Sequence, residues 1–344
     1  MAKIAILGCG FGAALAALWN AGGHKVTAWT KYNEEVQTIK RDGENKKVLP
    51  GVKLSRDINF TSDISEIKDC DILVFAVPSE FVRENAEKAV EFVTPETIIL
   101  SVGKGFERIT RKRLSVVLNE VFPNNKIAVM TGPCHAEEVG RRVPTTVVCA
   151  SNKKEAAFYV QDNLQSESLR IYLSDDVKGC ELGGALKNPI ALCCGIARGM
   201  GLGDNTVAAI MTRGLAEITR LSAALGAQWQ TFTGLAGMGD LIVTCSSELS
   251  RNNRAGRLIG QGTEASEAKK IIGTVEGYNA AETALELAKE HNVPLPITEQ
   301  LCKILFEGAK PAEALKSLMS RPVKCEKEEF WNCEACPLEG EICG

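Results

Sequence analysis

The strongest constraint on the fold is a strand, a glycine-rich turn and a helix at the start of the chain. An apolar strand at residues 3–7 runs directly into a turn with three glycines, and an apolar helix (13–19) and a second strand (25–29) follow. In such a βαβ unit the turn places backbone N–H groups at a helix N-terminus, where they bind a pyrophosphate. The pattern therefore predicts a dinucleotide site at this turn. Its predicted contacts are Gly8, Gly10 and Gly12.

Further short apolar runs are separated by segments of helical length. They are residues 71–77, 97–102, 126–130, 145–150 and 169–173. This alternation is typical of a mostly parallel sheet with helices on both faces, in which ligands bind beyond the carboxyl ends of the strands. Lys104 follows one of these runs and stands between two glycines, so it is a candidate ligand contact, with an ordinary loop lysine as the alternative.

After Ser174 the pattern changes, and from about residue 177 it predicts helices and no strand. We therefore expect an α/β fold, with an N-terminal Rossmann-type, doubly wound, mostly parallel sheet followed by an all-α substrate domain. The predicted boundaries are 1–176 for the dinucleotide-binding domain, 177–322 for the helical substrate and catalytic domain, and 323–344 for a cysteine-containing tail.

The helical domain begins with an unusual lysine in the stretch 181–189. On a helix, Lys187 shares a stripe with Gly183, Ala191 and Cys194, beside an apolar stripe that would face a core. Small residues let a ligand or another backbone come close. A lysine there would be partly desolvated, which lowers its pKa and makes it a candidate acid/base. The alternative is a surface lysine whose stem lies over the helix.

Two further features of the helical domain complete a candidate site. The glycine-rich stretch 234–239 follows no strand, so we expect it to bend the chain and present Asp240 rather than bind a nucleotide. Ser250 is a good N-cap for a helix to about Gly260, whose free N–H groups, together with Arg251, would bind a phosphate. An ordinary capped basic helix is the alternative.

The end of the second strand bears on the choice of dinucleotide. A carboxylate there favours NAD, because it accepts a hydrogen bond from the ribose 2′-hydroxyl and repels a 2′-phosphate. Here the strand is followed by Lys31, and the first carboxylate is Glu34. The sequence leaves NAD or NADP open and slightly favours NADP, with a solvated loop lysine as the alternative.

Composition excludes several other classes of function. The net charge of −3 argues against a nucleic-acid partner, and no apolar run reaches the length of a membrane span. The chain enters a strand at once, so we expect no signal peptide and a cytoplasmic location. Most of the thirteen cysteines lie in apolar patterns and would be buried thiols in a reducing compartment.

Ordered motifs beyond the glycine turn run through residues 3–320. They are Lys104-Gly105-Phe106, Thr131-Gly132-Pro133, Glu181-Leu182-x-Gly184-Ala185-Leu186-Lys187-Asn188, Gly201-x-Gly203-Asp204-Asn205, Thr212-Arg213-Gly214-Leu215-Ala216-Glu217, Gly234-Leu235-Ala236-Gly237-x-Gly239-Asp240-Leu241-x-x-Thr244-Cys245 and Ser250-Arg251-Asn252. Together they resemble the bacterial NAD(P)-dependent glycerol-3-phosphate dehydrogenases. The resemblance implies reversible reduction of dihydroxyacetone phosphate to sn-glycerol 3-phosphate for phospholipid synthesis, and we expect a homodimer.

The resemblance also implies roles for particular residues. Lys187 would be the proton donor and acceptor, with Lys104 as a second cation beside it and Asp240 holding it in place. The implied substrate contacts are Lys104, Gly132, Cys134, Lys187, Asp240, Ser250, Arg251 and Asn252. The implied cofactor contacts, besides the turn glycines, are Phe11, Lys31, Lys104, Ala136, Arg251, Thr274 and Glu276.

The sequence departs from the family pattern in three places. The glycine turn is one residue shorter than usual, and Cys134 replaces the usual serine, which is a better hydrogen-bond donor than a thiol. The third departure is an acidic tail with a C-x-x-C pair and two outlying cysteines, which could hold zinc or an iron–sulfur cluster, form a redox pair, or be passive. The candidate metal ligands are Cys325, Cys333, Cys336 and Cys343.

Two other functions fit part of the pattern. One is a related two-domain reductase of a 2-keto acid or an amino acid, against which the predicted phosphate-binding helix argues. The other is a non-catalytic dinucleotide-binding redox sensor, against which the presence of both Lys104 and Lys187 argues.

Overall fold

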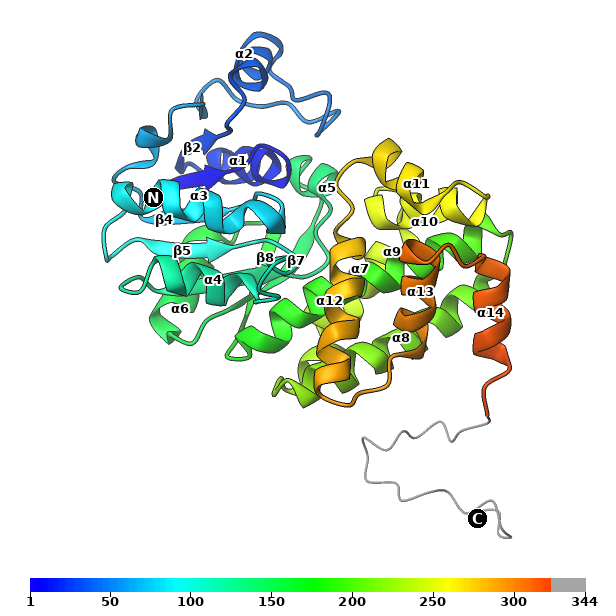
Figure 1. Ribbon diagram of the computed structural model, residues 1–344. Helices are drawn as coiled ribbons and strands as arrows, with labels where there is room; N and C mark the ends of the chain where they lie inside the picture. Colours follow the sequence, from blue (N-terminus) through cyan, green and yellow to red (C-terminus); the bar gives the residue numbers. More distant parts are fainter. Residues whose placement is uncertain (323–344) are drawn as a thin grey trace.

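The computed structural model describes residues 1–322, which form a sheet domain and a helical domain (Figure 1). The strands are β1 (Lys3–Leu7), β2 (Lys25–Trp29), β3 (Asn59–Thr61), β4 (Ile72–Phe75), β5 (Ile98–Ser101), β6 (Ile127–Thr131), β7 (Thr145–Ala150) and β8 (Leu169–Ser174). The helices among them are α1 (Phe11–Ala21), α2 (Asn33–Asp42), α3 (Val82–Ala89), α4 (Leu114–Val121), α5 (Ala136–Gly140) and α6 (Lys154–Leu164). The helical domain contains α7 (Val177–Gly199), α8 (Asp204–Ala224), α9 (Asp240–Ser246), α10 (Arg251–Gly260), α11 (Ala265–Ile272), α12 (Glu276–Glu290), α13 (Pro296–Phe306) and α14 (Pro311–Met319).

The strands of the described chain form one eight-stranded sheet in the order β3-β2-β1-β4-β5-β6-β7-β8. Neighbouring strands are parallel, with Ile4 of β1 opposite Val26 of β2 on one side and Ile72 of β4 on the other, whereas β6 and β7 are antiparallel. The strand order reverses between β1 and β4, and ligands of such sheets bind at the carboxyl ends of the strands there. The predicted fold, a mostly parallel doubly wound sheet followed by helices, is confirmed.

Side chains alternate between the two faces of the sheet along each strand, and helices cover both faces, so both are buried. In β1, Ile4 and Ile6 belong to the core beneath α1 and α6, while Ala5 and Leu7 belong to the core beneath α3 and α4. The same double burial explains why most strands appear in the sequence as continuous apolar runs. The short edge strand β3 lies in a polar segment and was not predicted.

Helix α7 is the centre of the helical domain and is buried along nearly its whole length. Glycines let α10 lie directly against it. A Cβ on Gly195 would lie 2.1 Å from the carbonyl oxygen of Asn253, and a Cβ on Gly256 would lie 2.2 Å from that of Leu192. This close packing fixes the start of α10 beside the middle of α7, where the candidate site lies.

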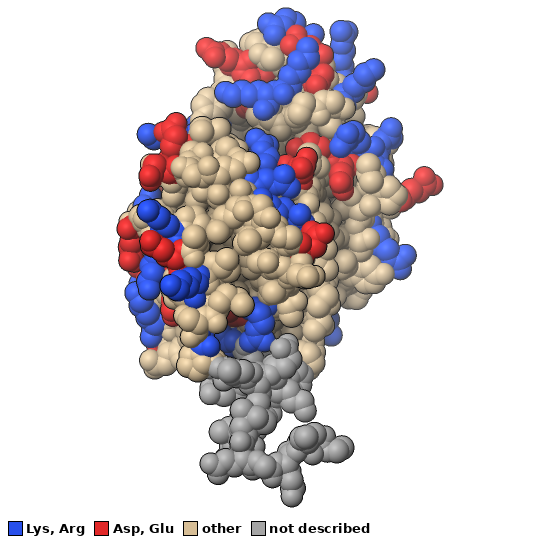
Figure 2. All heavy atoms as spheres, turned by 90° about the vertical axis from the view of Figure 1, so that its right-hand side faces the viewer, with Lys and Arg blue, Asp and Glu red and all other residues tan. Residues whose placement is uncertain are grey.

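No helix among residues 1–322 has the length and apolarity needed to cross a membrane. On the face that lies at the right of Figure 1, basic and acidic side chains are interspersed around a broad area without charged residues (Figure 2). This face therefore presents no continuous basic surface of the kind that binds nucleic acid.

Candidate active site

The turn between β1 and α1 is built on glycines with different surroundings. Gly8 has a φ of +106°, and a Cβ there would lie 2.9 Å from the carbonyl oxygen of Ala76. A Cβ on Gly12 would lie 2.7 Å from Cγ2 of Ile6, so this glycine lets α1 pack on β1. A Cβ on Gly10 would meet, among residues 1–322, Cγ1 of Val48 at 3.5 Å and no other atom within 4 Å. Packing within residues 1–322 does not require a glycine at position 10, so this side of the turn is accessible to a ligand.

Lys31 lies at the end of β2, apart from the cluster of lysines described below. Its ammonium is 5.1 Å from the ring centre of Tyr32 and 5.0 Å from that of Phe81. The nearby Glu35 accepts hydrogen bonds from Oγ1 of Thr30 (2.6 Å) and from Nδ2 of Asn45 (2.8 Å). The carboxylate of Glu35 is thus bound by the protein itself, while the Lys31 ammonium lies over two aromatic rings.

Lys104 follows β5 and reaches to the end of β6. Its Nζ donates to the carbonyl oxygen of Gly132 (2.7 Å), to Sγ of Cys134 (3.3 Å) and to Oδ1 of Asp240 (3.1 Å), and it lies 3.0 Å from Oδ2 of Asp240. The Cys134 thiol donates to the same Gly132 carbonyl (3.1 Å). The ends of two strands and α9 therefore meet at one ammonium group.

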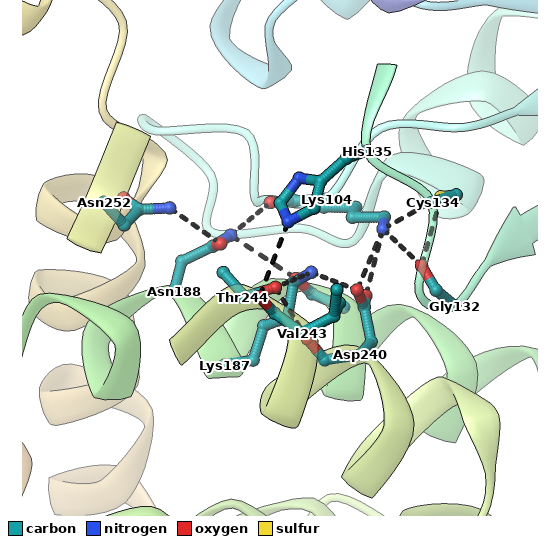
Figure 3. A network of polar contacts seen from close by, with 11 residues as sticks. Lys104, Gly132, Cys134, His135, Lys187, Asn188, Asp240, Val243, Thr244 and Asn252 are labelled. Carbon is teal, nitrogen blue, oxygen red and sulfur yellow. Dashed lines mark hydrogen bonds and ion pairs between the residues drawn. The ribbon is translucent and has the colours of Figure 1, made fainter. Parts of the chain in front are cut away.

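Lys187 projects from α7 into the same cluster (Figure 3). Its Nζ donates to Oδ1 of Asp240 and to Oγ1 of Thr244 (2.7 Å), and its side chain is 5% exposed. Gly183, one turn before Lys187, explains the position of Asp240. A Cβ there would lie 2.3 Å from the carbonyl oxygen of Ala236, so the glycine admits the π-helical turn Leu235–Gly239 that leads into α9. The small-residue stripe of α7 thus packs against the backbone of the turn that precedes α9.

Asp240 is shared by two lysines whose pKa values shift in opposite directions, although Asp240 raises both. Burial lowers the pKa of Lys187 to about 8; Asp240 opposes this and Lys104 adds to it. Burial also lowers the pKa of Lys104, but Asp240 and Cys134 outweigh burial and hold that pKa above its ordinary value. Lys104 therefore stays protonated at neutral pH, while Lys187 can exchange a proton.

A line of side-chain amides joins this cluster to the start of α10. Asn188 donates from Nδ2 to the carbonyl oxygen of Lys104 (2.9 Å) and accepts at Oδ1 from Nδ2 of Asn252 (2.9 Å). Asn252 in turn accepts at Oδ1 from the backbone N–H of Gly277 (2.9 Å). Ser250 caps α10 by accepting from the N–H of Asn253 (3.2 Å), as predicted. The N-terminus of α10 therefore opens beside the lysines.

The other predicted cofactor contacts lie at element starts around the cluster. Phe11, Ala136 and Arg251 are the first residues of α1, α5 and α10. Thr274 is half-buried just before α12, whose first residue, Glu276, accepts from the N–H (3.1 Å) and Oγ (2.5 Å) of Ser79. Burial raises the pKa of Glu276, and the nearby Arg251 opposes that rise. This contact joins the two domains.

Three residues of the site were not singled out by sequence reasoning. Thr244 contacts Lys187, Asn188 holds the Lys104 backbone, and His135 lies above the cluster with Nε2 3.5 Å from the carbonyl oxygen of Val243 (Figure 3). Burial lowers the pKa of His135, and the two lysines add to the effect, so the ring is neutral and Nε2–H is the donor. Thr244 could have been found, because it follows Asp240 by four residues on one helix face.

The predicted metal ligands Cys325, Cys333, Cys336 and Cys343 lie outside the described residues. Within residues 1–322 there is no group of three or more His, Cys, Asp or Glu side chains that could hold a metal ion. The tail site stays a prediction.

Comparison with known proteins decides the family. The profile for the N-terminal part of NAD-dependent glycerol-3-phosphate dehydrogenase matches residues 3–157, and the profile for its C-terminal part matches residues 176–316. The chain belongs to the NAD-dependent glycerol-3-phosphate dehydrogenase family. The predicted class of enzyme, an NAD(P)-dependent oxidoreductase, is thereby confirmed.

Individual relatives agree over nearly the full length. Glycerol-3-phosphate dehydrogenase (NAD(P)+) of Desulfitobacterium hafniense is 47% identical over 331 residues, which cover 96% of this chain and 94% of the relative. The enzyme of the same name from Thermoanaerobacter sp. is 48% identical, covering 94% and 98%. The crystal structure of glycerol-3-phosphate dehydrogenase from Coxiella burnetii matches with a TM-score of 0.89 at 34% identity, covering 93% of this chain and 99% of that one.

Proposed function

We propose that this protein catalyses the reversible, NAD(P)H-dependent reduction of dihydroxyacetone phosphate to sn-glycerol 3-phosphate, which supplies glycerophospholipid synthesis. The observation that carries the proposal is the carboxylate of Asp240, which accepts from two lysines. Lys187 comes from α7, and Lys104 comes from the loop after β5. The names of the relatives support it, and their near-full-length identity argues against a reductase of 2-keto acids or amino acids and against a non-catalytic sensor.

Lys187 is the group we assign as proton donor. Two of its three N–H bonds are directed to Asp240 and Thr244, which leaves the third for the carbonyl oxygen of the substrate. Bound NAD(P)H would supply the hydride to the carbonyl carbon. Lys187 then stabilises the negative charge that develops on oxygen and gives up its proton to it.

Lys104 supports this step by its charge. Because it stays protonated, the pair of lysines and Asp240 carry a net charge of +1 when Lys187 is protonated and zero after Lys187 has given its proton away. The repulsion from Lys104 favours that loss. Cys134 and Gly132, which contact the Lys104 ammonium, would lie beside the substrate at this end of the site.

The start of α10 is the proposed phosphate site. The first N–H groups of an α-helix have no partners within the helix and lie at the positive end of its dipole, and Arg251 adds a cationic side chain there. The amide of Asn252 is held by Asn188 on the side of the lysines, so it is placed between the phosphate and the reacting carbonyl.

We infer that NADPH is preferred to NADH. Lys31, at the end of β2, would pair with a 2′-phosphate, and the adjacent carboxylate of Glu35 is bound by Thr30 and Asn45. We also infer a homodimer, because the area without charged side chains in Figure 2 has the character of an interface centre. Light scattering after size-exclusion chromatography measures the mass, and a monomer at micromolar concentration would contradict the dimer.

A steady-state assay tests the function. Dihydroxyacetone phosphate should be reduced with NADPH or NADH, while unphosphorylated dihydroxyacetone should be a far poorer substrate. Lys187→Ala should abolish turnover and leave cofactor binding, followed by fluorescence titration, nearly intact. Absence of turnover with dihydroxyacetone phosphate, or near-normal turnover in the variant, would contradict the proposal.

A further inference from the structure

The loop that carries Lys104 leaves the sheet domain, but its side chains are anchored in the helical domain. Phe106 is 1% exposed and belongs to the core formed by α7, α8 and α12, where it is grouped with Leu186 of α7 and Ala284 of α12. A buried aromatic ring of this size is a strong anchor. Lys104, two residues earlier, is therefore attached to α7 and α12 as well as to the strand that precedes it.

Backbone contacts to the helical domain hold the same three residues. The carbonyl oxygen of Lys104 accepts from Nδ2 of Asn188 (2.9 Å), and that of Phe106 accepts from Nδ2 of Asn279 (3.0 Å). Between them Gly105 packs against the hydrogen-bonded pair Glu276 and Ser79, because a Cβ there would lie 2.7 Å from Oε2 of Glu276 and 2.7 Å from Oγ of Ser79. The segment 104–106 is thus held at each residue by α7 or α12.

The amide of Asn279 is not explained by the stability of the fold. Its Nδ2 donates to Phe106, but its Oδ1 is buried and has no hydrogen-bond partner among the described residues. A buried acceptor without a partner costs free energy that an apolar side chain at the same place would avoid. The hydrogen bond that this side chain makes within residues 1–322 is the one to the Phe106 carbonyl.

We propose that Asn279 is a positioning residue for the reduction: by holding the Phe106 carbonyl it keeps Lys104 beside Asp240 and Lys187. This inference rests on the proposed function and adds to it a residue of α12 that does not touch the reacting groups. Lys104 is the only lysine of the cluster that comes from the sheet domain, so its place beside Asp240 depends on how its loop is attached.

The expected consequence is electrostatic. If the segment loosens, the Lys104 ammonium would stay bound to the carbonyl of Gly132, just after β6, and move away from Asp240 on α9. The repulsion between the Lys104 and Lys187 ammonium groups would then be weaker, and Asp240 would interact with Lys187 alone. Both changes raise the pKa of Lys187. A merely structural contact would change the unfolding temperature without shifting the pH profile of turnover.

Asn279→Ala tests the inference, with Arg111→Ala as the matched control. Arg111 joins the same loop to the same helix through Glu290 (2.8 Å) and Glu286 (3.3 Å), at the exposed end away from the lysines. Loss of one hydrogen bond corresponds to a fall in kcat of about threefold to tenfold. We expect this fall in kcat for Asn279→Ala. We also expect the decrease of kcat at alkaline pH to move to higher pH in this variant, and neither change in Arg111→Ala.

Hydrogen–deuterium exchange of the peptide that contains residues 104–106 provides a readout without turnover. Exchange should be faster in Asn279→Ala than in the wild type or Arg111→Ala. Asn279→Ser, whose hydroxyl is too short to reach Phe106, serves if the alanine variant is recovered poorly. Wild-type kinetics, pH profile and exchange in the Asn279 variants would overturn the inference. Faster exchange in a protein that reduces no triose phosphate would instead refute the proposed function and leave the positioning contact standing.

Discussion

Replacing Lys104 by methionine should move the pH dependence of the reaction upward. In the proposed mechanism Lys187 must be protonated to deliver a proton during reduction, so we expect kcat for dihydroxyacetone phosphate to fall as the pH rises through the pKa of Lys187, which is about 8. Lys104 lowers that pKa by repulsion. Without Lys104 the pKa rises, and the fall in kcat moves to higher pH. Oxidation of glycerol 3-phosphate needs neutral Lys187, so its rise with pH should move in the same direction.

The magnitude follows from the shared carboxylate. Both ammonium groups donate to Oδ1 of Asp240, and Nζ of Lys104 is 3.1 Å from it. The two nitrogens are therefore roughly 5 Å apart, as two donors on one acceptor are. At an effective dielectric constant of about 20, two unit charges at that distance repel by about 3 kcal/mol. This energy corresponds to a shift of about 2 pH units in the alkaline limb.

The assay is kcat for reduction measured across pH at saturating cofactor for the wild type and Lys104→Met. Lys112→Met is the control, since Lys112 lies in the same loop but pairs with Glu120, away from the site. A lower kcat is expected for Lys104→Met at every pH, so the position of the limb is the measurement. If kcat of Lys104→Met falls at the same pH as kcat of the wild type, or at a lower pH, the electrostatic role of Lys104 is refuted.

Asp240→Asn leaves two buried ammonium groups without their carboxylate, which costs about 3–5 kcal/mol, so we expect both kcat and the midpoint of thermal unfolding to drop sharply; kinetics and calorimetry check this. Gly256→Ala would place a Cβ 2.2 Å from a carbonyl oxygen of α7, and urea unfolding should show a loss of about 1–3 kcal/mol or more. Lys31→Glu should lower kcat/KM for NADPH relative to NADH, and an equal ratio in both proteins would remove Lys31 from cofactor selection. Metal analysis of protein purified without added metal tests the tail: Cys333→Ser/Cys336→Ser should lose metal that the wild type holds, and equal, negligible metal in both would contradict the site.

Most of the sheet was predictable because its strands are buried on both faces and appear as continuous apolar runs. The direction of β7 was not, because a doubly buried strand has the same apolar pattern whether it is parallel or antiparallel to β6. The strand β3 has three residues and sits at the edge beside β2, where few apolar residues are needed. Its edge position, its short length and its polar surroundings explain why β3 was missed.

The candidate site was partly predictable for a different reason. The stripe that contains Gly183 and Lys187 required a close neighbour, and the structure supplies the backbone at Ala236, which leads to Asp240. The sharing of Asp240 could not be deduced, because it depends on how the sheet domain brings Lys104 to α9. No local pattern marks Asn279, since its importance lies in one contact with a residue 173 positions away.

The charge of the cluster explains why one carboxylate serves two lysines. If each ammonium had its own carboxylate, the site would be neutral, the pKa of Lys187 would be higher, and a developing oxyanion would gain less attraction. A single Asp240 leaves one positive charge uncompensated in a buried place, where it interacts strongly with new negative charge. The excess charge destabilises the resting protein and is relieved only when the substrate oxygen becomes negative, which is the condition for stabilising a transition state more than the bound substrate.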